Sequence, residues 1–339
     1  MKSTALVLGG HGFIGHHMAR RLKKEGYWVR TVDIKEFPYN DTFKGEVDDY
    51  VVEDLRNPYV CKYAFKAPFG SSFDRVYQFS AWMGGSQVVF SGDYDAQIMH
   101  DSAILDINVA EEAKNAGVGK IFFSSSACAY SMHNQISTLA KDITTREDSA
   151  YPADPDSDYG FTKLFSERLY QAYARNYGLN IRIARFHNIF AEEGAWGNKR
   201  EKVPAAVCRK IAQTPDDGEI EIFGDGEQTR SFLYIDECLE GVQRLMNSDF
   251  NGPVNIGSDE MVSINQLVGV VKDIAGKPGI KIKHIDGPLG VRGRTSDNKL
   301  IKEKLGWAPD YPLRRGLEKT FPWINDQVKA GKQDYSWTS

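Results

Sequence analysis

The sequence predicts an α/β fold, a Rossmann-type doubly wound parallel sheet with a smaller C-terminal α/β lobe. Three observations lead to this prediction. Short apolar runs alternate with amphipathic stretches through the first half of the chain, which is typical of repeated strand–helix–strand units. The short runs do not alternate polar and apolar residues, as expected of parallel strands covered on both faces. Closely spaced glycines follow the first run at once.

The expected elements follow from these runs in chain order. The first apolar run is read as a strand rather than as a signal peptide, because glycines interrupt it immediately. The later short runs are read as strands, and the longer amphipathic stretches between them as helices. We expect strands at Ser3–Leu8, Tyr27–Asp33, Asp49–Val52, Arg75–Phe79, Lys120–Ser124 and Ile181–Arg185, and helices at Phe13–Glu25, Asp101–Ala116 and Tyr159–Tyr177.

Composition narrows the functional classes. The chain has 339 residues and a net charge of -4, which argues against a general nucleic-acid coat or a binder of anionic membranes. It contains no apolar run of about 18 residues, so no membrane span is expected. Its four cysteines lie far apart and form no CxxC pair, so we expect no metal site and a reducing, cytoplasmic setting.

The second half is richer in glycine, proline and charge than the first. We expect a dinucleotide-binding domain over residues 1–187 and a substrate-binding domain over residues 188–339. The segment 230–256 is expected to rejoin the first domain, and the polar tail from about Ala330 to fray. The second domain would close over a ligand held at the carboxyl ends of the strands.

A glycine pattern follows the first expected strand. Gly9, Gly12 and Gly15 have the spacing GxxGxxG, which lets the backbone approach a pyrophosphate and lets a helix pack closely on the strand. Asp33 ends the second strand, where a carboxylate accepts hydrogen bonds from ribose hydroxyls and repels a 2′-phosphate. We therefore expect NAD rather than NADP, with further contacts from Phe13, Ile14, Asp54 and Leu55.

A second pattern is that of a catalytic site. Tyr159 and Lys163 are four residues apart, so on a helix they share one face. The Lys163 ammonium and the positive nicotinamide would lower the pKa of the phenol, which could then act as a general base. Serines Ser124–Ser126 end the fifth expected strand and precede Cys128. A packed tyrosine beside a surface lysine, and a small buried cysteine, are the alternative readings.

These motifs and the longer stretches given below resemble the GDP-mannose 3,5-epimerase family of extended short-chain dehydrogenases/reductases along most of the chain. The resemblance rests on GFIG at 12–15, MGG at 83–85, SSACAY at 125–130, DYG-x-x-K at 158–163, RFHNIF at 185–190, REKVPAAVCRK at 200–210, GDGEQTRSF at 224–232, GPVNIGSDEMVS at 252–263 and GVRGRTSDNKLIKEKLGWAP at 290–309.

The resemblance implies a mechanism in three stages. NAD⁺ oxidises the sugar at C4, the C4 ketone acidifies the protons at C3 and C5, and the transient NADH reduces the ketone again. It implies that Tyr159 is the base for oxidation with Lys163 in support, and that Cys128 and Lys202 exchange protons on opposite faces of the ring. Ser126 would assist at the reacting hydroxyl.

The resemblance also implies a GDP-sugar substrate and a homodimer formed by a four-helix contact between the first domains. The implied substrate contacts are Gly84, Ser125, Ser126, Asn188, Glu201, Lys202, Lys210, Gln228, Arg230 and Arg294. Arginine and lysine suit a nucleotide diphosphate, because guanidinium groups bind its oxygens in pairs. Each of these residues, taken alone, would be read as an ordinary surface charge.

One departure and two alternatives remain. The family has an aspartate where this chain has Trp82, a change that bears on the order or completeness of the two epimerisations. A 4-epimerase, 4,6-dehydratase or decarboxylase would share the oxidation step on the same scaffold, although Cys128 and Lys202 argue against these. A non-catalytic NAD-binding regulator is the more remote alternative, because the tyrosine–lysine pair is present.

Overall fold

The computed structural model describes residues 2–40, 42–82, 86–143, 145–197, 201–287 and 290–332. Its strands are β1 (Thr4–Leu8), β2 (Trp28–Asp33), β3 (Asp49–Val52), β4 (Arg75–Gln78), β5 (Lys120–Ser126), β6 (Ile181–Phe186), β7 (Ile189–Phe190), β8 (Glu219–Phe223), β9 (Thr229–Ser231), β10 (Leu233–Tyr234), β11 (Val254–Ile256), β12 (Met261–Ser263), β13 (Lys281–Ile285) and β14 (Gly293–Arg294).

The helices are α1 (Phe13–Lys24), α2 (Phe43–Glu46), α3 (Pro58–Ala64), α4 (Ser86–Val89), α5 (Asp95–Asn115), α6 (Asp158–Tyr177), α7 (Val203–Gln213), α8 (Ile235–Asn247), α9 (Ile264–Ala275), α10 (Lys299–Leu305) and α11 (Leu313–Lys329). Short 3-10 helices occupy Pro68–Gly70, Ala127–Ala129, Met132–Gln135, Ala140–Asp142 and Glu147–Ala150.

A seven-stranded sheet forms the centre of the molecule, in the order β11-β6-β5-β4-β1-β2-β3. Every neighbouring pair in it is parallel. The order reverses between β1 and β4, which is where doubly wound sheets open a crevice at the carboxyl ends of their strands. The predicted fold class is therefore confirmed.

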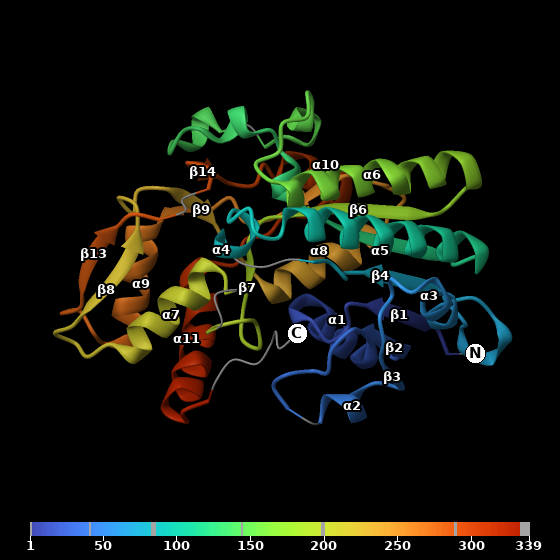
Figure 1. The fold of residues 1–339 in the computed structure, drawn as a ribbon, viewed down its shortest axis with the longest axis horizontal. Coiled ribbons are helices and arrows are strands. Elements are labelled where there is room, and N and C mark those ends of the chain that lie inside the picture. Colours follow the sequence, from blue (N-terminus) through green and yellow to red (C-terminus); the bar gives the residue numbers. More distant parts are fainter. Residues whose placement is uncertain are drawn as a thin grey trace.

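Helices cover both faces of this sheet (Figure 1). One apolar core joins the strands to α3, α5 and α6, through residues such as Cys61, Val109 and Tyr170. On the other face, α1 and α8 pack through residues such as Met18 and Val242. After β10 the chain runs through α8 and adds β11 at the edge of the sheet beside β6.

Strands β8, β9, β12, β13 and β14 and helices α7, α9 and α11 form a smaller lobe, coloured yellow to red at the left of Figure 1. There β8 pairs with β13 in parallel, and β9 lies between β12 and β14. Helices α7, α9 and α11 pack together through buried residues such as Val207, Leu267 and Leu317. This core is continuous with the one under α1 and α8, so the small lobe is joined to the sheet by apolar packing.

A buried ion pair supports the end of β5. Arg185 on β6 donates to Glu167 on α6 through Nε at 2.8 Å and Nη2 at 2.7 Å, and both side chains are almost wholly buried. Ser125 donates its hydroxyl to the same carboxylate at 2.5 Å. The Arg185–Glu167 ion pair therefore holds the side chain of Ser125, one of the serines at the end of β5, in a fixed position.

Replacing Glu167 with Ala is expected to lower the free energy of unfolding by about 3–5 kcal/mol, because it leaves the Arg185 guanidinium buried without its partner. Urea denaturation measures this loss. Asp148→Ala is the control, since it removes only an exposed ion pair with Arg146 and should cost no more than about 1 kcal/mol. Equal losses in the two variants would contradict the structural role of the pair.

Candidate active site

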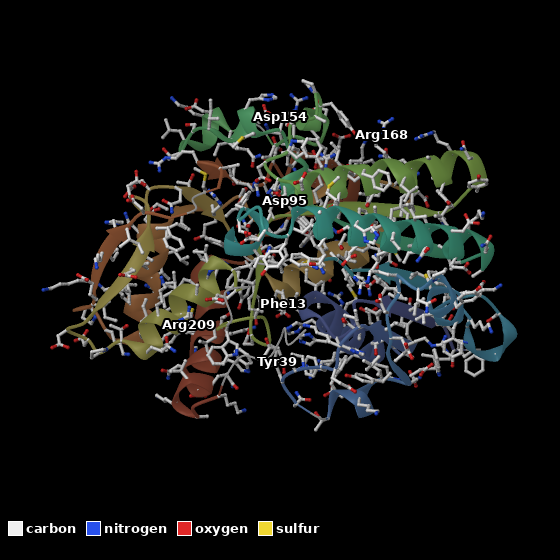
Figure 2. The ribbon with its side chains drawn as sticks, in the orientation of Figure 1. Phe13, Tyr39, Asp95, Asp154, Arg168 and Arg209 are labelled. Atoms are coloured by element: carbon white, nitrogen blue, oxygen red, sulfur yellow. The ribbon has the colours of Figure 1, made fainter. Side chains whose placement is uncertain are left out.

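A cavity of about 850 Å³ opens between the sheet and the small lobe, at the carboxyl ends of the strands. Figure 2 labels Phe13 beside the first turn of α1 and Arg209 on α7, on the side of the small lobe. Fourteen of the residues predicted to act at a site line the cavity: Gly9, Gly12, Phe13, Ile14, Gly15, Asp33, Asp54, Leu55, Ser125, Ser126, Tyr159, Lys163, Asn188 and Lys202.

The glycine turn forms a cradle that side chains would fill. Gly9 has a φ of +73°, and a Cβ there would lie 2.7 Å from the backbone nitrogen of Ser80. A Cβ on Gly15 would lie 2.0 Å from the carbonyl oxygen of Gly9. Helix α1 begins directly after Gly12, whose lack of a side chain leaves the first N–H groups of the helix open to an anion. This geometry fits the pyrophosphate of a dinucleotide.

Asp33 is held in place at the end of β2. Its Oδ2 accepts a hydrogen bond from the backbone N–H of His11 at 3.1 Å. The His11 ring is buried, stacks on Tyr50 with ring centroids 3.9 Å apart, and contacts Thr31 through Nε2. His11, in the glycine turn, therefore buries its ring beneath the loop, and its backbone N–H donates to the Asp33 carboxylate. The fixed carboxylate suits a ribose with free hydroxyls.

The next strand end contributes Asp54 and Leu55. Arg56 binds the Asp54 carboxylate through Nε and Nη2, and this contact lowers the pKa of Asp54. Arg56 also reaches Asp101 on α5. Leu55 is buried and presents an apolar surface to the cavity. The wall at this end of the cavity thus combines the apolar Leu55 with the paired charges of Asp54, Arg56 and Asp101.

Tyr159 and Lys163 both lie in the first turns of α6 and both are buried. The helix start is capped by Ser157, whose hydroxyl accepts from the N–H of Gly160. A Cβ on Gly160 would lie 2.2 Å from the carbonyl oxygen of Cys128, so the glycine lets α6 approach the end of β5. Lys163 Nζ lies 5.7 Å from the Tyr159 ring and donates to the Ser124 carbonyl at 2.9 Å.

The pKa of Tyr159 is raised, which is opposite to the expected effect of the neighbouring ammonium. Burial raises it most, the charge of Cys128 adds to this, and a hydrogen bond with Ser126 opposes both. Burial also lowers the pKa of Lys163, although the charge of the buried Asp106 opposes that shift. Burial is thus the largest influence on the pKa of Tyr159, and the Lys163 ammonium donates to the Ser124 carbonyl.

Cys128 lies in the 3-10 turn that follows β5, where the Ser126 hydroxyl accepts from its backbone N–H at 3.2 Å. Arg294 donates to its sulfur through Nη1 at 3.3 Å. The other guanidinium nitrogens of Arg294 donate to Gln135 at 2.5 Å and to Asp156 at 2.6 Å. Arg294 is therefore engaged within the protein beside the thiol, and a direct grip on a diphosphate stays a prediction.

Lys202 is the residue directly before α7 and reaches the cavity from the small lobe. Lys202 keeps an exposed surface, and the protein that surrounds its amine lowers the pKa of the ammonium, with Arg294 acting in the same direction and Cys128 opposing it. Lys202 and Tyr159 line the same cavity, whereas Cys128 is not among its lining residues and packs against the apolar cluster that contains Tyr159. The fold thus brings Cys128, Tyr159 and Lys202 to one region from β5, α6 and α7.

Several predicted substrate residues lie off the cavity lining. Glu201 accepts from Arg209, Lys210 donates to the carbonyl of Glu221, and burial lowers the pKa of Arg230 to about 9. Among the described residues, Oε2 of Glu201 and Oε1 of Gln228 are buried without a hydrogen-bond partner. Gly84 lies outside the described residues. The substrate roles of Gly84, Glu201, Lys210, Gln228, Arg230 and Arg294 stay predictions.

Sequence analysis missed two parts of the cavity wall. Tyr94 lies just before α5, and its ring lies 5.3 Å from that of Trp82, so an aromatic pair lines one side. Glu193 and Gly194 line another part of the wall. Tyr94, Glu193 and Gly194 belong to no motif of fixed spacing. Tyr94 follows the MGG motif at 83–85, and Glu193 and Gly194 follow the RFHNIF motif at 185–190.

Comparisons with known proteins agree with this geometry. Residues 5–257 match the model of the NAD dependent epimerase/dehydratase family. GDP-mannose 3,5-epimerase of Arabidopsis thaliana is 45% identical over 96% of this chain and 83% of its own length. The structure of UDP-glucose 4-epimerase from Thermotoga maritima with UDP-glucose is 25% identical, has a TM-score of 0.80, and covers 96% of this chain and 99% of its own. UDP-glucuronic acid 4-epimerase from Bacillus cereus, in complex with UDP-glucuronic acid and NAD, is 25% identical, with a TM-score of 0.76 over 95% of this chain and 99% of its own.

Proposed function

This chain belongs to the NAD dependent epimerase/dehydratase family and, within it, to the GDP-mannose 3,5-epimerases, and on that premise we propose how it acts. It uses NAD to convert GDP-D-mannose into GDP-L-galactose, GDP-L-gulose or both. The observation that supports this proposal is that Tyr159 and Lys202 line one cavity, and that Cys128 packs against the apolar cluster to which Tyr159 belongs. Oxidation at C4 needs only the tyrosine, whereas exchange at C3 and C5 also needs an acid and a base of this kind.

Bound NAD would supply a reversible hydride acceptor for C4 of the sugar, held by the glycine turn and Asp33. Tyr159 takes the proton of the C4 hydroxyl, with Ser126 as its hydrogen-bond partner. The positive nicotinamide of bound NAD⁺ would favour the phenolate and so oppose the burial that raises the pKa of this phenol. The resulting ketone acidifies the neighbouring C–H bonds, since a carbanion next to a carbonyl is stabilised as an enolate. Cys128 and Lys202 then remove and return protons at C3 and C5.

The environment of Lys202 suits this role. Its lowered pKa means that the ammonium gives up a proton more readily near neutral pH than an ordinary lysine does. Arg294 supports Cys128 through its contact with the sulfur. A guanidinium beside the sulfur stabilises the thiolate, which is the form that removes a proton from carbon. Both members of the pair therefore have surroundings that match their chemistry.

The alternatives differ in what this pair would do. A 4-epimerase, dehydratase or decarboxylase on this scaffold gives Cys128 and Lys202 no shared task. A non-catalytic regulator leaves the buried Tyr159 and Lys163 at the cavity wall without a function. The proposed epimerase uses all four residues.

Product analysis tests the proposal. Purified protein with bound NAD is incubated with GDP-mannose, and the sugars released by acid hydrolysis are separated by chromatography. We expect L-galactose, L-gulose or both to appear without net formation of NADH. Unchanged GDP-mannose, or a product altered only at C4 or C6, would contradict it.

We also propose that the protein is a homodimer formed through α5 and α6. These helices pack on each other, and their outer surfaces expose Met99, Ile107, Phe161 and Phe165, each by more than two fifths of its surface. Paired apolar helix faces of this kind commonly form subunit contacts. Light scattering should give twice the chain mass of 38.1 kDa, and a single chain mass would contradict the proposal.

A cytoplasmic location is proposed on chemical grounds. All four cysteines, Cys61, Cys128, Cys208 and Cys238, carry free thiols, as is usual in a reducing compartment. No helix in the described parts of the chain has the length and apolar character that crossing a membrane requires.

A further inference from the structure

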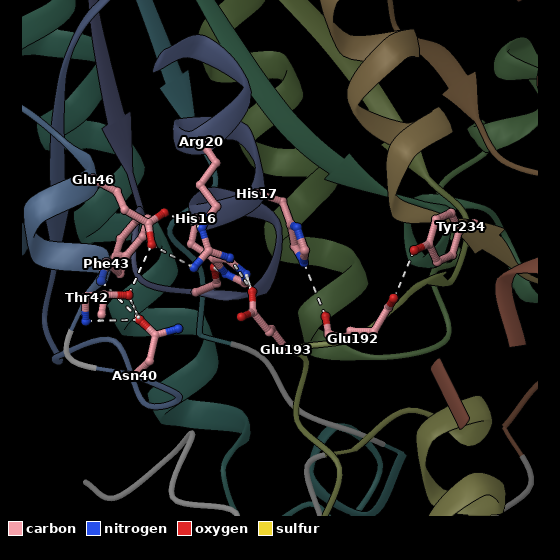
Figure 3. Close-up of polar contacts among 11 residues, drawn as sticks. His16, His17, Arg20, Asn40, Thr42, Phe43, Glu46, Glu192, Glu193 and Tyr234 are labelled. Carbon is pink, nitrogen blue, oxygen red and sulfur yellow. Dashed lines mark hydrogen bonds and ion pairs between the residues drawn. The ribbon is translucent and has the colours of Figure 1, made fainter. Parts of the chain in front are cut away.

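A second polar cluster lies behind the glycine turn, where the loop of residues 191–195 meets α1 (Figure 3). The Glu193 carboxylate accepts hydrogen bonds from His16 Nε2 at 3.0 Å and from Arg20 Nη1. Arg20 also donates through Nε to Glu46 on α2 at 2.6 Å. One acidic side chain of the loop is thus tied to two basic side chains of the helix that begins at the cofactor cradle.

The backbone of this loop is shaped by the same contact. Glu193 has a φ of 55°, in the left-handed region that residues other than glycine seldom adopt. Its neighbour Gly194 lies against Phe13, where a Cβ would come within 3.2 Å of the ring. Ala191, Glu193, Gly194 and Ala195 all line the cavity. The carboxylate contact therefore offsets an unfavourable conformation and holds the loop on the first residue of α1.

Arg20 is the donor that persists at neutral pH. The two ring nitrogens of His16 face the Gly12 carbonyl at 2.8 Å and the Glu193 carboxylate, and both partners only accept hydrogen bonds. Both bonds exist together only when the ring is protonated, and burial lowers the pKa of His16. The guanidinium stays charged at any such pH, so Arg20 holds Glu193 when the imidazole is neutral.

A metal ion is the competing reading of this cluster, because ligand atoms of His16, His17 and Glu193 lie within 4.8 Å of one another. However, Arg20 donates to the same Glu193 oxygen that faces His16. His17 directs its Nε2 at the Glu192 carbonyl at 3.2 Å. A divalent cation would have to displace the guanidinium or lie beside its charge, so the geometry favours the ion pair.

We propose that Glu193, held by Arg20 and His16, is a positioning residue that fixes the 191–195 loop across the dinucleotide cavity and keeps NAD bound throughout turnover. The inference rests on the proposed function, in which one cofactor takes a hydride from C4 and returns it. If NADH left after oxidation, its two electrons would go with it, and the sugar would be stranded as the 4-ketone. Retention is therefore part of the chemistry.

The test is the rate at which NAD leaves the purified holoenzyme, measured without any sugar by chase with labelled NAD. Glu193→Gln keeps the size of the side chain but removes its charge, and should speed release about tenfold or more, since charge-assisted hydrogen bonds of this kind contribute about 1.5–3 kcal/mol. Arg20→Gln should act in the same direction. The double variant should show much less than the product of the two effects, because both changes remove one contact.

Glu192→Gln is the matched control, because this neighbouring carboxylate binds the Tyr234 hydroxyl at 2.9 Å on the far side of the loop (Figure 3). Its NAD release should equal that of the unaltered protein. During turnover, Glu193→Gln should release NADH and 4-keto sugar in equal amounts, and added NAD should restore multiple turnovers.

Unchanged NAD release in Glu193→Gln would overturn the inference. One tightly bound zinc per chain, lost in His16→Ala, would also overturn it in favour of a metal site. The two proposals fail separately: faster NAD release in a protein that leaves GDP-mannose untouched would support the loop anchor and reject the epimerase.

Discussion

Replacing Tyr159 with Phe should nearly abolish turnover, with kcat about 10²–10⁴-fold lower and KM for GDP-mannose changed little. The variant loses only the hydroxyl that takes the C4 proton, while the ring still fills the cluster formed with Val89 and Ile98. Because the first step fails, no NADH absorbance should appear when substrate is mixed with enzyme in stopped flow. Bound NAD should remain at one per chain.

Tyr173→Phe is the control for that experiment. Tyr173 lies on the same helix, but its hydroxyl donates to Glu111 on α5, away from the cavity. Its kcat should match that of the unaltered protein. A Tyr159→Phe variant that oxidises GDP-mannose at a normal rate would assign the first proton transfer to another group.

Replacing Cys128 with Ala should separate oxidation from epimerisation. The tyrosine and lysine remain, so NADH absorbance should still appear and then decay as the ketone is reduced back to GDP-mannose. Formation of epimerised sugar should fall by about 10²–10⁴-fold, the usual contribution of a positioned acid–base group. Time-resolved absorbance and product chromatography measure the two steps in the same sample.

Cys61→Ala controls for the general effect of losing a thiol, because Cys61 is buried under α3 in the opposite core. It should keep full epimerase activity. Cys128→Ala with a normal yield of epimerised product would remove the thiol from the mechanism and leave an oxidoreductase that acts only at C4.

The parts of the fold that sequence predicts best are those with local signals. The glycines after β1 and the apolar runs of β1 to β6 lie within a residue or two of their expected positions. Helix α5 begins at Asp95 rather than at the expected Asp101; its first six residues include the apolar Ile98 and Met99 but are too few to show a helical period. The strands of the small lobe were not resolved individually, since β9, β10, β12 and β14 span two or three residues each and show no period.

The site shows the same division. Tyr159 and Lys163 share a helix face, so their spacing alone predicts their proximity. By contrast, Arg294 and Cys128 are 166 residues apart in the sequence, and the three contacts of Arg294 cannot be deduced from spacing. Burial at Tyr159 also depends on the whole fold, which is why the direction of its pKa shift differed from the expectation. Long-range packing is the information that local patterns lack.

The most direct measurement of the central claim is NMR of the sugar nucleotides formed from GDP-mannose in deuterated water. A transient C4 ketone with exchange by Cys128 and Lys202 predicts deuterium at C3 and C5, and protium retained at C4, because the hydride returns from the same cofactor. Product without deuterium at either C3 or C5, or with label only at other carbons, would contradict the account.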